Sequence, residues 1–167
     1  MKLKNFVLSS LFLAIGFLLH QITPPFLFGM KPDFLLIMMF IAIFLVNDYK
    51  ITLIVGIVSG ILTAAATTFP GGQIPNLIDK IITCQMVYIL FKTLKNKLNS
   101  NMNIIIVCII GTFISGMIFL TSAFFIVGLP VSFGVLVLTV VLPATLINTV
   151  ASFFLFKIVN TALRYSM

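Results

Sequence analysis

The sequence is poor in charge. Only 8% of its 167 residues are charged and only three are acidic, whereas 61% are hydrophobic. Soluble domains devote about a quarter of their residues to charge, so this chain has too few polar groups to cover a surface in water. The mean hydropathy of +1.28 agrees. We therefore expect the solvent to be a lipid bilayer, in which long continuous apolar runs predict helices and not a β-barrel.

Cysteine, histidine and catalytic motifs are also scarce. Two cysteines and one histidine make neither a zinc site nor a disulfide framework, and Cys84 and Cys108 are expected to be buried as small hydrophobic side chains. The chain has no P-loop, no HExxH sequence and no nucleophile–base–acid set, so we expect neither enzyme activity nor a cofactor. No acid lies in the middle of the third, fifth or sixth apolar segment, where ion-coupled carriers often place one.

Turn residues and charges divide the chain into six apolar segments. We predict helices over residues 6–22, 33–47, 51–68, 75–91, 104–127 and 131–159, in one transmembrane domain of residues 1–167. The first run lacks a small-residue cleavage site and is predicted to span the membrane rather than act as a signal peptide. The second is short for a hydrocarbon layer about 30 Å thick, so it either extends through its flanks or lies beneath a covering loop. The sixth contains Pro143, where we expect a kink.

The basic residues indicate the orientation of this all-α integral membrane protein. If six helices cross the bilayer, the outer side receives only Lys31 and Lys80, and the other basic residues share the opposite side: Lys2, Lys4, Lys50, Lys92, Lys95, Lys97, Lys157 and Arg164. The positive-inside rule then places both termini in the cytoplasm, and residues 24–32, 67–76 and 128–130 outside. Because these charges lie at helix ends, the net charge of +7 does not indicate nucleic-acid binding.

One polar stretch interrupts the apolar chain. Residues 67–76, Thr-Thr-Phe-Pro-Gly-Gly-Gln-Ile-Pro-Asn, combine two prolines and two glycines with the amides of Gln73 and Asn76. A passive membrane anchor has little use for a rigid, uncharged loop, whereas a pocket at the membrane surface needs one. Phe69 lies in this loop and can stack on an aromatic ligand, although phenylalanine in membrane proteins more often serves packing.

Two of the three acidic residues begin predicted helices beside a lysine, at Lys31–Asp33 and Asp79–Lys80. Helix ends explain them in part, because Asp33 can cap its helix, Asp79 lies near a helix N-terminus, and Lys80 can extend outward to water. A lysine near the bilayer centre costs about 2.5–3.5 kcal/mol, so Lys80 needs a partner or hydration. The same groups suit a zwitterionic amino acid, whose carboxylate needs a cation such as Lys80 and whose ammonium needs an acid or carbonyl. The candidate substrate-binding residues are Lys31, Asp33, Phe69, Gln73, Asn76, Asp79 and Lys80.

Small residues recur at intervals of four on three of the predicted helices. Gly56, Gly60 and Ala64 lie on the third, Ser10 and Ala14 lie on the first, and Gly111 and Ser115 lie on the fifth. Small side chains let helix backbones approach closely, and packing drives helix association in lipid. Each stripe therefore either packs within the chain or docks another membrane protein, and Ser10 and Ala14 are the candidate partner-docking pair.

Two strings carry a resemblance. They are Gly29-Met30-Lys31-Pro32-Asp33-Phe34-Leu35-Leu36 and Thr68-Phe69-Pro70-Gly71-Gly72-Gln73-Ile74-Pro75-Asn76-Leu77-Ile78-Asp79-Lys80. They resemble the bacterial tryptophan transporter family TrpP, the substrate-binding S components of energy-coupling factor (ECF) transporters. The resemblance implies a compact ECF S-component-like bundle that binds tryptophan, or a related aromatic molecule, near its outer surface. It also implies docking to a transmembrane T component through the first helix, and two cytoplasmic ATPase subunits that hydrolyse ATP in place of this chain.

Two other functions remain open from the sequence. MreD-type scaffold proteins of rod-shape and cell-wall synthesis share a helix start like Pro32-Asp33-Phe34-Leu35-Leu36. They tend to carry an acid before a Ser-Gly step on the third helix, where this chain has Gly56-Ile57-Val58 before Ser59-Gly60, and a scaffold has no evident use for the polar loop. An S component for a vitamin would keep the fold and change the ligand.

Overall fold

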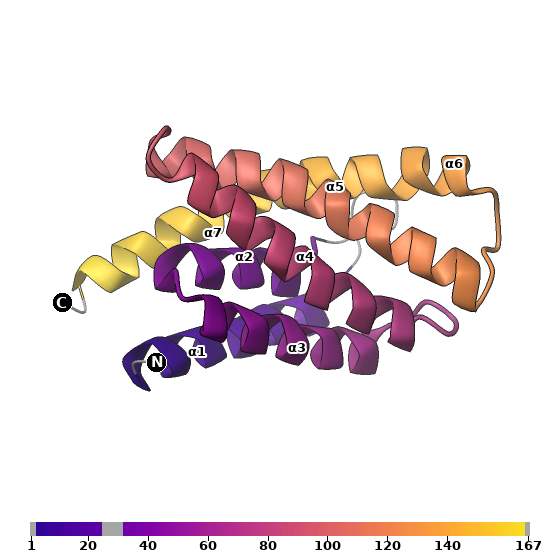
Figure 1. Cartoon of the computed structure of the whole chain (residues 1–167), viewed down its shortest axis with the longest axis horizontal. Coiled ribbons are helices and arrows are strands. Elements are labelled where there is room, and N and C mark those ends of the chain that lie inside the picture. Colours follow the sequence, from indigo (N-terminus) through magenta and orange to yellow (C-terminus); the bar gives the residue numbers. More distant parts are fainter. Residues whose placement is uncertain (1–2, 25–31, 166–167) are drawn as a thin grey trace.

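The computed structural model describes residues 3–24 and 32–165, and within them the regular structure is entirely helical. The elements are α1 (Leu3–Ile22), α2 (Phe34–Val46), α3 (Tyr49–Ala66), α4 (Gln73–Leu94), α5 (Ser100–Ile126), α6 (Phe133–Leu136), the π-helical turn η1 (Val137–Val141) and α7 (Leu142–Tyr165). The last three form one continuous helix, Phe133–Tyr165, which with α1, α3, α4 and α5 is long and apolar enough to cross a membrane. The expected all-α membrane bundle is confirmed (Figure 1).

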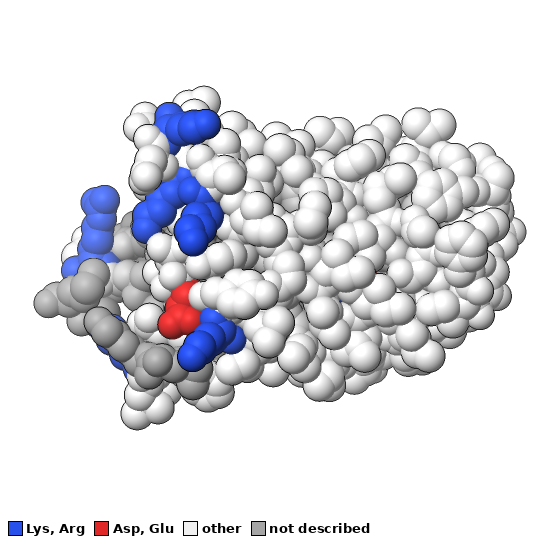
Figure 2. Space-filling model, in the orientation of Figure 1, with Lys and Arg blue, Asp and Glu red and all other residues white. Residues whose placement is uncertain are grey.

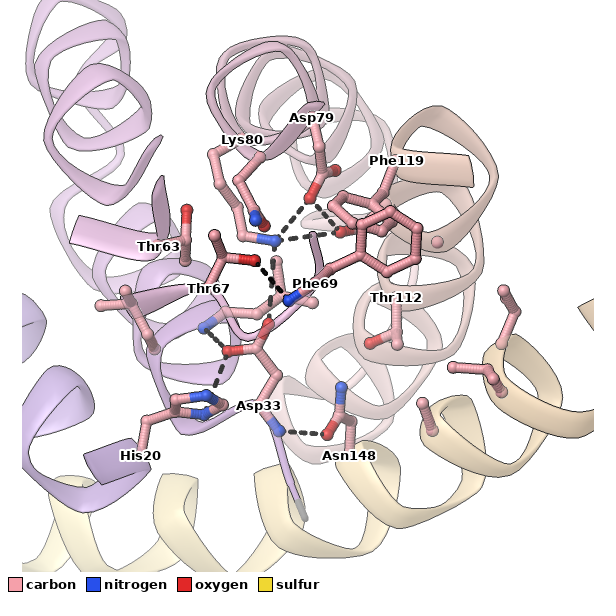
Figure 3. A pocket seen from close by; sticks show the side chains of 18 of the residues that line it. His20, Asp33, Thr63, Thr67, Phe69, Asp79, Lys80, Thr112, Phe119 and Asn148 are labelled. Atoms are coloured by element: carbon pink, nitrogen blue, oxygen red, sulfur yellow. Dashed lines mark hydrogen bonds and ion pairs between the residues drawn. The ribbon is translucent and has the colours of Figure 1, made fainter. Parts of the chain in front are cut away.

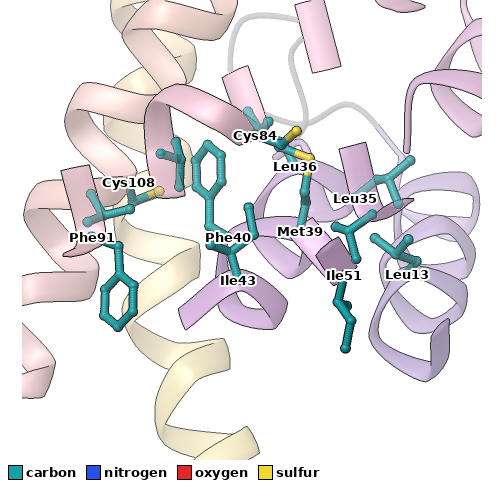
Figure 4. Close-up of a cluster of buried hydrophobic side chains, with 13 residues drawn as sticks. Leu13, Leu35, Leu36, Met39, Phe40, Ile43, Ile51, Cys84, Phe91 and Cys108 are labelled. Carbon is teal, nitrogen blue, oxygen red and sulfur yellow. The ribbon is translucent and has the colours of Figure 1, made fainter. Parts of the chain in front are cut away.

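The central helix of the bundle is α2. Every residue from Leu35 to Ile43 is buried, as expected for a helix that is apolar on all sides. It contacts α1, α3, α4, α5 and α7, and Figure 4 shows Leu36, Met39 and Phe40 among side chains of its neighbours. Its 13 residues rise only about 20 Å, so it covers the half of the bundle nearest the chain termini (Figure 1). Among residues 3–24 and 32–165, no helix occupies the centre of the outer half.

Side-chain caps fix where α2 and α3 begin. Asp33 caps α2, since its Oδ1 accepts the backbone N–H of Leu36 at 3.0 Å, and Asp48 caps α3 through the N–H groups of Lys50 and Ile51. Asn47 ends α2 in the left-handed conformation with φ 46°, which asparagine tolerates better than most residues. The capping role predicted for Asp33 is therefore confirmed.

Charge gathers at one end of the bundle. Both chain ends and the α2–α3 and α4–α5 connections lie at this end (Figure 1), and on the face drawn in Figure 2 the lysines and arginines cluster there. The positive-inside rule makes it the cytoplasmic end, with the α3–α4 and α5–α6 connections at the outer end. Lys80 lies inside the bundle with only 3% of its surface exposed, so it does not extend outward to water.

The last helix changes geometry in the turn that precedes Pro143. Residues Val137–Val141 are π-helical, and the N–H of Leu142 bonds to the carbonyl of Val137. A proline has no N–H to donate and its ring crowds the preceding turn, which favours such an irregularity at this place. The wider turn faces the cavity described below with Val140 and Val141.

The glycine stripe of α3 packs within the chain, against α4. A Cβ at Gly56 would collide with Sγ of Cys84, and one at Gly60 would lie 2.9 Å from Cδ1 of Leu77. Both cysteines are free and buried, as expected. The close approach of α3 and α4 therefore depends on glycine at these positions.

We expect Gly56→Ala to destabilise the protein by about 1–3 kcal/mol, because the added methyl group overpacks this contact. Melting in detergent measures the effect, and Cys84→Ala in the same chain should restore part of the loss by removing Sγ. Gly134→Ala is the matched control, because a Cβ there meets no atom within 4 Å. An equal melting temperature for Gly56→Ala and the parent protein would contradict the close packing.

Candidate substrate-binding site

A cavity of ≈350 Å³ lies between the start of α2 and the α3–α4 loop. All the long helices contribute to its wall, and so does η1. Its volume falls in the usual range of small-molecule pockets, about 300–1,000 Å³. Its lining is largely apolar with a few convergent polar groups, and the labelled residues in Figure 3 include most of these. The shortness of α2 creates the space, because no helix fills the centre of the outer half.

Lys80 and Asp79 form a buried ion pair in the wall of this cavity. The ammonium group of Lys80 contacts Asp79 Oδ2 directly and donates to Ser115 Oγ at 3.3 Å. Ser115 in turn donates to Asp79 Oδ2 at 2.9 Å, and Thr83 donates to Asp79 Oδ1 at 2.8 Å. Both charged side chains are almost fully buried, 4% and 1% exposed, so each charge is compensated inside the protein and not by water.

Asp33 is the more open carboxylate. Its side chain is 30% exposed, and its Oδ2 lies 3.7 Å from Lys80 Nζ while its Oδ1 lies 3.8 Å from His20 Nδ1. The backbone N–H of Asp33 donates to Asn148 Oδ1 at 2.8 Å, a contact between the start of α2 and the last helix. Figure 3 shows Asp33 at the meeting point of these groups, so it joins α1, α4 and α7 at one place.

The cavity also has an aromatic wall. Phe69 of the α3–α4 loop and Phe119 of α5 pack edge to face, with ring centroids 5.4 Å apart and an interplanar angle of 85°. Phe17 of α1 lines the cavity as well. Aromatic rings in this arrangement offer both faces and edges to a flat ligand. The site therefore combines charged groups with aromatic surface.

The structure brings together most of the predicted substrate-binding residues. Asp33, Phe69, Asn76, Asp79 and Lys80 line the cavity. Gln73 is exposed in the first turn of α4 and does not line it, and Lys31 lies outside the described residues. The interpretation that gave Lys80 to a ligand carboxylate meets a difficulty, because its ammonium group already has Asp79, Ser115 and Asp33 around it.

The sequence interpretation did not include residues of α5, η1 and α7 in the site. Thr112, Ser115 and Phe119 come from α5 and Asn148 from α7. Their helices read as uniformly apolar, so no periodic pattern distinguishes the face toward the cavity from the face toward lipid. One signal could have identified them: polar side chains in the middle of an apolar membrane helix usually face the bundle interior.

A second, apolar cavity of ≈390 Å³ lies on the other side of α1, between α1 and α3. Ser10 and Ala14 line it, and both are exposed. They are therefore not used for packing against another described helix, unlike Gly56 and Gly60. Their exposure is the condition that a docking pair must meet.

Apolar spanning helices around a cavity that holds charged and aromatic groups define a multi-pass membrane protein of the transport class. The chain belongs to the family described as "Tryptophan transporter TrpP", whose pattern matches residues 2–164. It is therefore a bacterial membrane transport protein.

Three curated relatives carry the name "Probable tryptophan transport protein". One from Clostridium acetobutylicum is 54% identical over 164 residues, which cover 98% of this chain and 96% of the relative. Another, from Bacillus subtilis, is 46% identical over 99% of this chain and 96% of its own length, and one from Clostridium perfringens is 44% identical over 96% and 93%. No solved structure matches the chain. These findings give no support to the MreD-type scaffold or to a vitamin as the ligand.

Proposed function

We propose that this chain binds tryptophan, or a closely related aromatic compound, in the cavity above α2 as the S component of an ECF-type importer. The observation that carries the proposal is the composition of the cavity, which joins the Asp33–Lys80–Asp79 charge cluster to the Phe69–Phe119 wall. An aromatic amino acid has the matching parts, an ammonium and a carboxylate at one end and an aromatic ring at the other. Family membership and the names of the relatives support tryptophan as that amino acid.

The S-component role assigns the energy for tryptophan uptake to partner subunits. The sequence contains no P-loop, so the proposal assigns ATP hydrolysis to two cytoplasmic ATPase subunits coupled through a transmembrane T component, and no cofactor to this chain. The exposed small residues Ser10 and Ala14 beside the α1–α3 groove support a docking face on α1.

Reconstitution tests the S-component role. Proteoliposomes that contain this chain alone should not accumulate tryptophan when ATP is supplied at the cytoplasmic face. Vesicles that also contain the T component and both ATPases should accumulate it. Uptake by the chain alone, driven by an ion gradient, would contradict the role and identify a secondary carrier.

Added bulk on α1 should separate binding from uptake. We expect Ser10→Leu with Ala14→Leu to leave tryptophan affinity within about twofold of the parent and to reduce uptake by cells at least about tenfold, because leucine prevents close helix approach. Leu11→Phe with Ile15→Phe is the matched control, since it adds bulk at the same spacing to exposed α1 residues that do not line the groove. Normal uptake by the Ser10–Ala14 variant would remove this face from the proposed interface.

A further inference from the structure

We propose that the cavity selects ligands by their ammonium group, which lies against Asp33, and that the amide of Asn148 receives the ligand's carboxylate as an uncharged hydrogen-bond donor. The proposal rests on the proposed function and extends it to a substrate class, aromatic compounds that carry an ammonium group, with or without a carboxylate. It assigns Asn148 of α7 as a residue that distinguishes ligands.

The first step is the balance of charge. Among the described residues that line the cavity, the carboxylates are Asp33 and Asp79 and the sole lysine is Lys80. Lys80 is in direct contact with Asp79, and its remaining donors face Ser115 Oγ at 3.3 Å and Asp33 Oδ2 at 3.7 Å. An ammonium group has three N–H donors, so Lys80 is already surrounded. Counted against lysine alone, the described part of the cavity wall therefore carries one carboxylate in excess, and the histidine of the wall, His20, has its Nδ1 3.8 Å from Asp33 Oδ1.

The second step locates this excess. Asp79 is 1% exposed and accepts hydrogen bonds from Ser115 and Thr83, whereas Asp33 is 30% exposed. The open negative charge is thus on Asp33. In a low-dielectric pocket such a charge attracts a cationic group and repels an anionic one. The ammonium group of a ligand compensates the charge of Asp33, whereas a ligand that carries only a carboxylate is repelled by it.

The third step concerns Asn148. Its Oδ1 accepts the backbone N–H of Asp33, and because that partner is a donor, the amide oxygen must face it and Nδ2 must face away. Figure 3 shows Nδ2 of Asn148 pointing away from Asp33 into the cavity. The residue is only 1% exposed, and no described residue accepts a hydrogen bond from this NH₂ group. This NH₂ group is a donor on the wall of the cavity, and a ligand carboxylate can accept a hydrogen bond from it.

Two analogues of tryptophan separate the charges. Tryptamine keeps the ammonium and lacks the carboxylate, and indole-3-propionate does the reverse. In calorimetric titration of the full chain in detergent at pH 7, we expect tryptamine to bind within about 30-fold of tryptophan and indole-3-propionate to bind at least about 100-fold more weakly than tryptophan. Stronger binding of indole-3-propionate than of tryptamine would overturn the proposal.

Asn148→Asp tests the assignment of the amide. An aspartate keeps an oxygen for the N–H of Asp33, replaces the NH₂ donor by a second acceptor and, when ionised, adds a negative charge that repels a ligand carboxylate. We expect tryptophan affinity to fall at least about tenfold while tryptamine affinity stays within about threefold or rises. Ser152→Ala, a buried polar position one turn further along α7 and outside the cavity, should change neither.

The outcomes distinguish this proposal from the proposed function. Equal losses for tryptophan and tryptamine in Asn148→Asp would show a structural role for Asn148 and overturn its assignment to the carboxylate. If the parent protein binds tryptophan and indole-3-propionate but not tryptamine, the selectivity proposal fails while the proposed function stands. Absence of binding for all three compounds would overturn both.

Discussion

Replacing Lys80 by methionine is expected to destabilise the protein by about 3–5 kcal/mol, because it leaves the carboxylate of Asp79 without its cation inside the bundle. Asp79 is 1% exposed, so water cannot take the place of the lost ammonium group. Thr83 and Ser115 would still donate to the carboxylate, but two hydroxyl groups do not neutralise its charge. For a chain of this length, the loss corresponds to a melting temperature lower by about 10 °C.

The double variant Asp79→Asn with Lys80→Met should recover most of this loss. It removes both charges together, and the asparagine amide can still accept from Thr83 and donate to Ser115. Melting of both variants and the parent in one detergent, at one heating rate, measures the difference. A double variant that is less stable than Lys80→Met alone would contradict the account of the pair as mutual charge compensation.

Asp33→Asn is expected to weaken tryptophan binding by about 100-fold or more while leaving the fold intact. The substitution removes the open carboxylate that faces the ligand's ammonium group, and losses of about 2–5 kcal/mol are usual for one partner of a buried charged pair. Stability should change little, because asparagine caps a helix as well as aspartate does and its Oδ1 can still accept the N–H of Leu36. Calorimetric titration and melting of the same preparation give both quantities.

Asp48→Asn is the matched control. Asp48 caps α3 as Asp33 caps α2, but it lies at the cytoplasmic end and does not line the cavity. We expect the two variants to have similar melting temperatures and only Asp33→Asn to lose affinity for tryptophan. An affinity loss below about threefold in Asp33→Asn would remove Asp33 from the ligand site.

The sequence predicted the solvent and the helices because both depend on composition and on local residues. Long apolar runs specify spanning helices wherever the chain places them, and the basic residues at their ends specify orientation. The short α2 was recognisable by its length. Because α2 lies within the cytoplasmic half of the bundle, room is left for the cavity in the outer half. Asp79 and Lys80 stood out because charge is so rare in this chain.

The sequence could not predict which helices approach the polar loop. In lipid, the helix face toward the bundle and the face toward the membrane are both apolar. The residue pattern of α5 and α7 therefore does not predict that Phe119 and Asn148 face the cavity. Gln73 was selected with Asn76 because both carry amide groups in the polar loop, but Gln73 lies one turn nearer the outer end of α4 and is exposed. Lys80 contacts Asp79 directly, and both also bond to Ser115 of α5, which is remote in sequence.

This geometry also changes the expected effect of losing Lys80. The sequence offers Lys80 as a cation for the ligand's carboxylate, and in that role its loss would weaken ligand binding more than stability. The structure surrounds its ammonium group with Asp79, Ser115 and Asp33, so stability is now the property expected to suffer most.

The measurement that tests the central claim most directly is a calorimetric titration of the purified full chain in detergent with tryptophan, with phenylalanine and riboflavin as controls. The account predicts saturable binding of one tryptophan per chain, weaker binding of phenylalanine and none of riboflavin. A protein that melts cooperatively but does not bind tryptophan, or that binds riboflavin equally well, would contradict it.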